Sequence, residues 1–555
     1  MSGNHPPAET EPGSNASPRD VIISLLIALV VAMLAKTYII EAFVIPTGSM
    51  APGLLGNHIR FQSEETGYSW AVAPWHYSGR GGTGDPLTVQ GRIIDPTTGE
   101  VIQRDANPWV HDPMTSSGRE SDLGYRSEPV PKELLAGDRV LVDKFVYQFR
   151  DPRRYEVAVF KNPTDVPQNF IKRIVGLPGE EVWLVEGDVF VREVDEERAI
   201  DEGWRIARKP RSVQEAVWQP IVDAAFTPLP AMDGGEDLDW WREPWGGEKW
   251  RREGRRYVLE ASDAEMGGWL VLNNRHWPVT DWTAYNDVAG QRHRREIFPV
   301  GDVRVRFGVR TPESWSVGVQ RLAVSITTKG HEFEARLNEL AETGSDAGEW
   351  MLRMRTIGGD WEPLGRSETG EIFDGGQFVN VSFEHADQAV RLVVDGKTIV
   401  EGGYEWSPVE RLRHATGWER DRIMGAAGYR LHEPEQYDAV RPTIAVWVGH
   451  EEGEIVRLAV DRDLHYQPVG DRAVQPGRPA NLGKGEFFAV GDNSANSEDG
   501  RDWRSVDPVI TDSFELQPGV VERRLLLGRA LMVYFPSPLP GVVPMVDFGR
   551  VRAIR

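Results

Sequence analysis

Two short segments place a serine and a lysine where the pair could do acyl-transfer chemistry. Ser49 stands in Phe-Val-Ile-Pro-Thr-Gly-Ser-Met, residues 43–50, just after an apolar span at 21–40. Lys172 lies in the apolar run Phe-Ile-Lys-Arg-Ile-Val, residues 170–175. A serine hydroxyl is a poor nucleophile until a base takes its proton. A lysine next to such a serine would be that base only in its neutral form.

The neutral form of a lysine requires a special environment. A free lysine has a pKa near ~10.4, and lowering it to about 8 takes roughly 3 kcal/mol of destabilisation of the charged form. The apolar neighbours of Lys172 have the composition that burial requires. Lys144, in the apolar stretch 137–147, is a rival base by composition. Because most lysines are solvated charges, composition alone leaves this choice open.

A third segment supplies polar turn residues far along the chain. Residues 491–501 read Gly-Asp-Asn-Ser-Ala-Asn-Ser-Glu-Asp-Gly-Arg. Taken alone, this composition is typical of a surface turn in which Asn and Asp side chains bond to the backbone.

Together the three segments resemble bacterial type I signal peptidase, the membrane-bound Ser/Lys endopeptidase that removes signal peptides from exported proteins. The resemblance implies that Ser49 is the nucleophile, that Lys172 is the general base and that the reaction passes through an acyl-enzyme. It places the oxyanion hole at the Ser49 N–H and at the hydroxyl of Thr47, where the family often has serine. It assigns supporting roles to residues of the third segment: Ser497, which orients the lysine, the ion pair of Asp499 and Arg501, and Gly491.

The resemblance also implies a specificity. The family selects small residues, commonly alanine, at positions −1 and −3 of the cleavage site. The positions that match its pocket are Phe43, Ile45, Pro46, Met50 and Ile171. Two positions depart from the family pattern: Ser494 and Gly500 stand where many members have a basic residue and a serine. We expect modest effects from both, because neither position carries chemistry in the family.

The span at 21–40 is long enough to cross a bilayer. About 20 residues at 1.5 Å each match a hydrocarbon core of about 30 Å. A cleavable signal peptide fits less well, since almost no basic charge precedes the span. The loop charges give almost no orientation signal. The resemblance implies one pass through the bacterial cytoplasmic (inner) membrane, with the catalytic domain on the outer, periplasmic side.

Composition excludes several classes of partner. The net charge of −22 argues against nucleic acid, which requires clustered Lys and Arg. The chain has no cysteine, and its 12 histidines are scattered without a His-Glu-x-x-His motif. We therefore expect no disulfide, no metal site and no cofactor. The expected partners are exported preproteins and the lipid bilayer, and the sequence does not indicate an oligomeric state.

The predicted fold is mainly β, with an antiparallel signal-peptidase catalytic domain interrupted by an inserted β-sandwich of jelly-roll type. The length of 555 residues allows several domains. The expected parts are a disordered cytoplasmic tail at 1–20, a transmembrane helix at 21–41, catalytic pieces at 42–56, 137–190 and 481–555, a loop-rich insertion at 57–136, and a second insertion at 191–480 with a sandwich at about 230–470. The glycine-rich stretch 79–84 lacks a phosphate-binding pattern and is expected to be a loop.

The sandwich is predicted from alternating short strands. The expected strands are 268–272, 303–307, 322–326, 351–354, 378–383, 390–397 and 455–460. The pair at 378–383 and 390–394, closing on Asp395-Gly396, resembles a hairpin of laminin-G or concanavalin-like domains, which often bind sugars or proteins. The Trp-rich stretch 240–245 could stack on sugars, although packing at the sandwich edge is the better interpretation.

An alternative function is a membrane-anchored binding or adhesion protein on a catalytically degenerate peptidase scaffold. Retention of Ser49, Lys172, Thr47 and Ser497 together argues against degeneration. A self-cleaving Ser/Lys repressor fits poorly, because the chain has a membrane span and no DNA-binding segment. If the sandwich is accessory, a variant lacking about 230–470 is expected to keep some activity.

Overall fold

The structure is a computed structural model of the 555-residue chain. The residues that it describes are 18–63, 66–73, 92–94, 101–103, 110–111, 113–114, 126–127, 135–195, 199, 201–228, 241–260, 267–286, 297–310, 322–337, 349–367, 376, 378–426, 441–449, 452–512, 515–537 and 547–555. Most of the predicted tail and the glycine-rich stretch 79–84 lie outside these residues.

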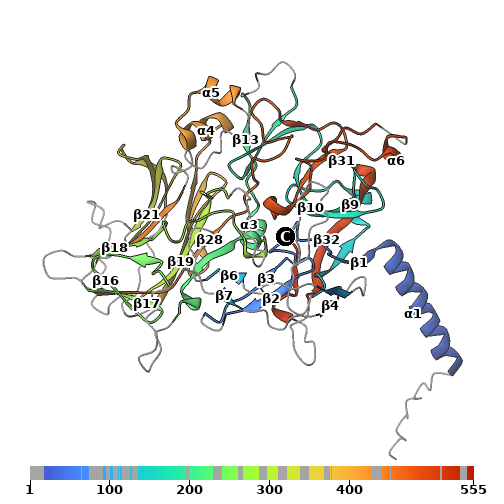
Figure 1. Ribbon diagram of the computed structural model, residues 1–555, viewed down its shortest axis with the longest axis horizontal. Coiled ribbons are helices and arrows are strands. Elements are labelled where there is room, and N and C mark those ends of the chain that lie inside the picture. Colours follow the sequence, from blue (N-terminus) through green and yellow to red (C-terminus); the bar gives the residue numbers. More distant parts are fainter. Residues whose placement is uncertain are drawn as a thin grey trace, which may run out of the picture.

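Helix α1 (Pro18–Tyr38) projects away from the body of the molecule (Figure 1). Its apolar side chains from Val21 to Met33 are exposed wherever their burial is described. In the part of the chain that the structure describes, no helix is long and apolar enough to cross a membrane.

An antiparallel sheet of eight strands unites segments that are far apart in sequence. Figure 1 shows blue, teal and red strands side by side at the right of the molecule. Along the sheet the order is β1 (Ile40–Val44), β8 (Arg139–Asp143), β32 (Leu526–Phe535), β9 (Val157–Lys161), β10 (Asn169–Gly176), β30 (Glu486–Val490) and β31 (Val521–Glu522), with β33 (Arg552–Ala553) on β32. The two insertions thus lie between strands of one sheet in the chain. This sheet brings all three motif segments together.

The first insertion forms short hairpins where it is described. They pair β2 (Ile59–Gln62) with β3 (Ser69–Val72), β4 (Arg92–Ile94) with β5 (Val101–Gln103), and β6 (Val110–His111) with β7 (Arg126–Ser127). A separate four-stranded sheet follows β10 of the eight-stranded sheet. Its order is β13 (Arg205–Ile206), β12 (Asp188–Glu193), β11 (Glu180–Val185) and β29 (Ala480–Asn481). The short helices α2 (Val146–Phe149) and α6 (Pro508–Thr511) belong to the catalytic segments.

The second insertion is a sandwich of two antiparallel sheets around one apolar core. One sheet has the order β16 (Trp250–Glu253), β17 (Arg256–Glu260), β28 (Glu452–Arg462), β19 (Val303–Arg310), β24 (Phe378–Ala386), β25 (Ala389–Val394) and β26 (Lys397–Gly403), with β14 (Gln219–Asp223) on β28. The other has the order β15 (Trp245–Gly246), β18 (Gly268–Leu272), β27 (Thr443–Val448), β20 (Leu322–Thr328), β21 (His331–Leu337), β22 (Trp350–Thr356) and β23 (Glu362–Arg366). The sandwich includes β14, so it begins earlier in the chain than about 230.

The alternation of apolar residues predicted these strands well. Six of the seven expected segments lie on a strand, because every second side chain is needed in the shared core. The seventh, 390–397, covers most of β25, the turn at Asp395-Gly396 and the first residue of β26. One turn was assigned to the wrong hairpin. Asp387 and Gln388, both with positive φ, join β24 to β25, whereas Asp395-Gly396 joins β25 to β26. Trp241 and Trp245 are buried, which confirms packing for these two residues; Trp240 lies outside the described residues.

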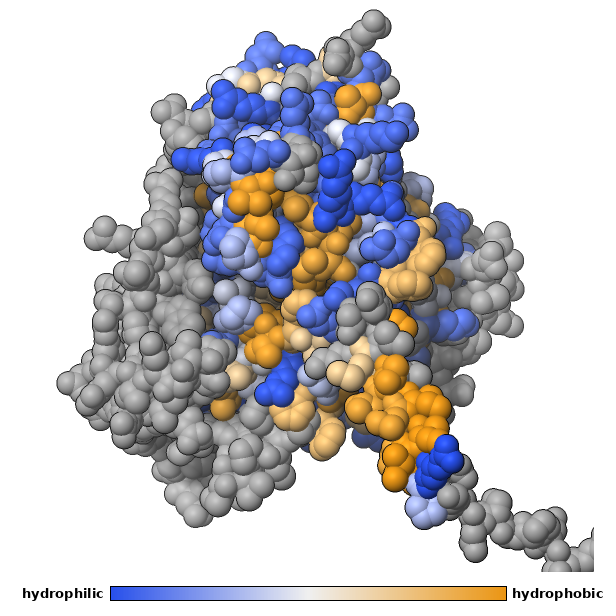
Figure 2. All heavy atoms as spheres, turned by 90° about the vertical axis from the view of Figure 1, so that its right-hand side faces the viewer, coloured by the Kyte–Doolittle hydropathy of each residue, from blue (hydrophilic) through white to orange (hydrophobic). Residues whose placement is uncertain are grey.

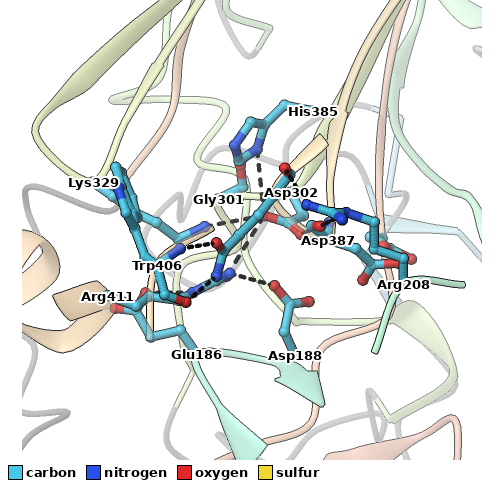
Figure 3. Close-up of polar contacts among 12 residues, drawn as sticks. Glu186, Asp188, Arg208, Gly301, Asp302, Lys329, His385, Asp387, Trp406 and Arg411 are labelled. Atoms are coloured by element: carbon cyan, nitrogen blue, oxygen red, sulfur yellow. Dashed lines mark hydrogen bonds and ion pairs between the residues drawn. The ribbon is translucent and has the colours of Figure 1, made fainter. Parts of the chain in front are cut away.

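A buried cluster of charges joins the sandwich to the four-stranded sheet (Figure 3). Arg411, on helix α4 (Pro408–Thr416), lies between carboxylates of both parts: 2.6 Å from Asp188 and 3.2 Å from Glu186 in the small sheet, and 3.7 Å from Asp302 in the sandwich. Helix α4 begins with a capping box of Ser407 and Glu410, and α5 (Arg420–Gly425) follows it. The cluster fixes the inserted domain against the catalytic part, because buried charges are stable only while they stay paired.

Three carboxylates of this cluster could in principle hold a metal ion. Oxygens of Asp188, Asp302 and Asp387 lie within 4.8 Å of one another. Each of them already faces a cation of the chain. Asp302 is 3.0 Å from Lys329, Asp387 pairs with Lys209, and Asp188 pairs with Arg411. We therefore interpret the cluster as a network of ion pairs.

Candidate active site

Ser49 lies in a tight loop that follows β1. The loop is closed by two backbone hydrogen bonds, from Ala51 N–H to Gly48 O at 3.0 Å and from Leu54 N–H to Met50 O at 2.8 Å. The Ser49 carbonyl accepts a hydrogen bond from Asn493 N–H at 3.0 Å, and only 7% of the residue is exposed. The loop of residues 48–54, named the nucleophile loop after the expected role of Ser49, is therefore fixed directly to the third motif segment.

Lys172 lies on β10, in the middle of the catalytic sheet, between β9 and β30. Its Nζ donates a hydrogen bond to Ser497 Oγ at 3.0 Å, and 3% of the residue is exposed. Burial lowers the pKa of the Lys172 amine to about 8; the Asp499 carboxylate opposes this shift and Arg501 reinforces it. About half of the amine is neutral near pH 8, so a proton acceptor is available under mild conditions.

Gly491 lies between the serine and the partner of the lysine. A Cβ built on this glycine would overlap Ser497 Oγ on one side and the Ser49 carbonyl oxygen on the other. A side chain here would force the nucleophile loop away from Ser497 and hence from Lys172. The glycine is needed for close approach, since its backbone conformation is an ordinary one.

A buried ion pair supports this turn. Arg501 Nη2 lies 2.8 Å from Asp499 Oδ2, which also accepts a hydrogen bond from Gly491 N–H at 2.9 Å. Burial opposes the charge of Asp499, but Arg501 outweighs it and lowers the pKa of this carboxyl. The predicted pairing of Asp499 and Arg501 is present, and it holds the glycine that lies between Ser49 and Ser497.

The two departures from the family pattern have local physical causes. The hydroxyl of Ser494 accepts hydrogen bonds from Arg501 Nη1 at 2.5 Å and from Gln467 N–H at 2.7 Å. A Cβ on Gly500 would meet Gly519 O and the Phe488 ring at 2.8 Å. In this chain a basic residue at 494 would meet the Arg501 guanidinium, and a serine at 500 would not fit.

Lys144, the rival base, lies in a different environment. Its Nζ is 3.0 Å from Glu41 Oε2, and its side chain is 30% exposed. The geometry favours Lys172.

Four of the five expected pocket residues share one apolar cluster. Ile45 and Met50 are buried in it, and Phe43 and Ile171 pack against it with part of each side chain accessible. Pro46 is exposed outside the cluster. Thr47, the second expected oxyanion donor, is half-buried in the bend that precedes Ser49.

Sequence reasoning missed Tyr285 and Asn286 beside the nucleophile loop, and it gave Asn493 only a place in the turn of the third motif segment. Asn493 Nδ2 donates to Gly48 O at 2.9 Å, and Asn286 of the second insertion exchanges hydrogen bonds with the Asn493 amide. Tyr285 packs against Gly48, where an added Cβ would overlap its ring. No periodic or spacing signal marks Tyr285 or Asn286, because they lie in a loop more than 200 residues from their partners in the third segment and the nucleophile loop.

Comparison with known proteins finds a family match in part of the chain. Residues 124–219 match the family of signal peptidase, peptidase S26. The chain is similar to type I signal peptidases. Lys172 falls inside the matched segment, whereas Ser49 and Ser497 fall outside it.

Two cyanobacterial relatives illustrate the extent of the match. A probable signal peptidase I-2 of Synechocystis sp. is 44% identical over 71 residues, which are 12% of this chain and 32% of the relative. Signal peptidase I of Leptolyngbya laminosa is 41% identical over 73 residues, which are 12% of this chain and 36% of the relative. The chain thus spans about a third of the length of these two proteins.

Two solved structures match this chain over most of their own length, but they superpose on it weakly. A carbohydrate binding module CBM66 from Bacillus subtilis is 5% identical, covering 39% of this chain and 95% of the neighbour, with a TM-score of 0.23. A winged bean acidic lectin is 9% identical, covering 40% and 93%, with a TM-score of 0.24. We draw no functional conclusion from either.

Proposed function

We propose that this protein is a membrane-bound serine endopeptidase that cleaves N-terminal signal peptides from exported preproteins after small residues at −1 and −3. The observation that carries the proposal is the environment of Lys172. Its buried amine has a pKa near 8 and bonds to Ser497, and Gly491 brings Ser497 against the Ser49 peptide.

The proposed reaction follows from these contacts. Neutral Lys172 takes the proton of the Ser49 hydroxyl as this oxygen attacks the scissile carbonyl, and the protonated amine then gives a proton to the leaving nitrogen. Water hydrolyses the acyl-enzyme with Lys172 again as base. Ser497 holds the amine in place through its 3.0 Å hydrogen bond. The Ser49 N–H and the Thr47 hydroxyl donate hydrogen bonds to the carbonyl oxygen and stabilise the negative charge that develops on it. Losing one such donor typically raises the barrier by about 2.7–4 kcal/mol.

The proposed substrate enters from the membrane side. The apolar cluster packs Ile45 and Met50 against side chains of β8, β9 and β32. Phe43 and Ile171 at its edge are partly accessible, and they would contact small side chains and exclude large ones by overlap. Residues 21–41 are the proposed membrane anchor. Their support is the exposed apolar surface of α1, which stands out in orange in Figure 2 next to β1. This arrangement would hold Ser49 close to the bilayer that carries the substrate.

The binding-protein alternative is not favoured. A degenerate scaffold would not need a buried lysine that has no ion-pair partner among the described residues, since such a lysine lowers the stability of the fold. A carbohydrate or protein ligand of the sandwich stays a prediction.

The test is cleavage of a preprotein with an Ala-x-Ala site by the full-length, detergent-solubilised protein. Ser49→Ala should abolish a single, correctly placed cut, while Ser69→Ala, a change at an exposed serine of β3, should leave it intact. Absence of a cut by the wild type across several signal peptides, or a cut that survives Ser49→Ala, would overturn the proposal.

A further inference from the structure

A loop of the second insertion lies directly against the nucleophile loop. The Tyr285 hydroxyl donates to Asn57 O at 3.0 Å, and the Tyr285 carbonyl accepts from Ala73 N–H at 2.8 Å. The ring lies over Gly48, and only 2% of the tyrosine is exposed. This part of the inserted domain is therefore built into the wall of the candidate active site.

The next residue, Asn286, forms a reciprocal pair with Asn493 of the third motif segment. Asn286 Nδ2 donates to Asn493 Oδ1 at 2.7 Å, and Asn493 Nδ2 donates to Asn286 Oδ1 at 2.8 Å. The second hydrogen of Asn493 Nδ2 goes to Gly48 O at 2.9 Å. The two donors of this amide are thus divided between the insertion and the nucleophile loop.

The carbonyl of Gly48 and the N–H of Ser49 belong to one planar peptide group. In a trans peptide the two groups point in opposite directions, so a hydrogen bond that fixes the carbonyl also fixes the direction of the N–H. The Ser49 N–H is the main oxyanion donor of the proposed reaction. The amide of Asn493, together with the Ala51 N–H that also donates to Gly48 O, consequently fixes where that donor points.

The two ends of an asparagine amide differ, because the oxygen accepts hydrogen bonds and the NH2 group donates them. Rotation of the amide by 180° exchanges the two ends. If Asn493 turned its oxygen toward Gly48 O, two acceptors would face each other and the peptide would be pushed away. Asn286 opposes this rotation, because it presents an acceptor to Asn493 Nδ2 and a donor to Asn493 Oδ1.

We propose that Asn286 of the inserted β-sandwich is a positioning residue for the oxyanion hole, acting through Asn493 on the Gly48–Ser49 peptide. The proposal rests on the proposed function. The inserted domain then completes the active site, and the charge cluster around Arg411 keeps it in place. Deletion of about 230–470 would remove this support, so the contacts predict loss of activity, not partial retention.

The decisive variant is Asn286→Asp in the full-length protein. It has nearly the same size, but it places an oxygen opposite Asn493 Oδ1, which repels that oxygen and removes the preference of the pair for the present orientation of the Asn493 amide. Since losing an oxyanion donor costs about 10²–10³-fold in kcat, we expect misdirection of one to cost about 10-fold or more, with KM nearly unchanged. In Asn286→Ala, which adds no charge, the pH at half-maximal kcat should stay where it is, because Lys172 keeps its environment.

Asn274→Asp is the matched control. Asn274 lies in the same insertion and donates to Thr443 Oγ1 at 3.2 Å, within the sandwich. The same chemical change there should leave kcat unaltered. An Asn286→Asp variant whose kcat equals that of Asn274→Asp would overturn the proposal.

A double-mutant cycle tests whether the effect of Asn286 passes through Asn493. If Asn286 acts through Asn493, then Asn286→Ala should add nothing to Asn493→Ala, and additive losses would contradict the proposed route. Thermal unfolding of each variant identifies any that fail to fold. A wild type that cleaves, together with an unaffected Asn286→Asp, refutes this inference alone; cleavage that survives Ser49→Ala refutes the proposed function and this inference with it.

Discussion

Two buried lysines of this protein have opposite chemistry. Lys172 in the candidate active site and Lys209 at the junction with the sandwich are both almost inaccessible to solvent. Burial lowers the pKa of Lys172 to about 8, with a serine hydroxyl as its hydrogen-bond partner. At Lys209 the carboxylates of Asp387 and Asp463 outweigh burial and raise the pKa well above its usual value.

The comparison shows that burial alone does not produce a base. Both regions are deep in the fold, and what differs is the charge of the closest partner. A lysine that meets two carboxylates stays a cation and joins two domains, whereas one that meets a hydroxyl is ready to lose its proton. Lys144 differs from both, because its side chain is 30% exposed and pairs with Glu41.

The largest expected effect separates Lys172 from the partly exposed Lys144 by function. Lys172→Ala should abolish cleavage, a loss of about 10³-fold or more, because Ser49 would have no base. The variant should remain folded, since it removes a poorly solvated amine. Lys144→Ala, the matched control, should keep near-normal kcat. Cleavage by Lys172→Ala at the wild-type rate would show that another group is the base.

The next effect concerns the junction. Arg411→Met should lower the free energy of unfolding by about 3–5 kcal/mol, because it leaves buried carboxylates without their cation. Urea unfolding would measure this loss. Arg336→Met is a suitable control, since that side chain is 37% exposed in its ion pair with Glu334. Equal stability of the two variants would mean that the cluster does not hold the domains together.

A smaller effect is expected at the hydrogen-bond partner of Lys172, the proposed base. Ser497→Ala should lower kcat by about 10- to 100-fold, as expected for loss of a hydrogen bond worth roughly 1.5–3 kcal/mol when charge is involved. KM should change little, since Ser497 contacts the lysine. Steady-state kinetics with the same preprotein would check this, and an unchanged kcat would remove Ser497 from the site.

The motif residues and the strands could be predicted because they depend on local patterns. The alternation in 378–383 and 455–460 reflects the shared core of the sandwich. The turn at Asp387-Gln388 was missed because it reaches positive φ without a glycine, whereas the nearby Asp395-Gly396 carries the usual signal.

The contacts between the domains could not be read from sequence. Asn286 meets Asn493 across 207 positions, and a single asparagine in a loop has no periodicity. The ion pairs of Arg411 likewise join residues brought together only by the fold. Burial of Lys172 was predictable from its apolar neighbours. That Lys172 has no ion-pair partner among the described residues was not.

The most direct test is the pH dependence of kcat for the wild type beside Ser497→Asp. A neutral base with a pKa near 8 makes wild-type kcat rise with pH, reach half its maximum near pH 8 and level off above it. Ser497→Asp places a carboxylate next to Lys172, as at Lys209, so its midpoint should move to higher pH. A wild-type kcat that is flat from about pH 7 to 9, or a midpoint that Ser497→Asp does not move, would contradict the role of Lys172 as the base.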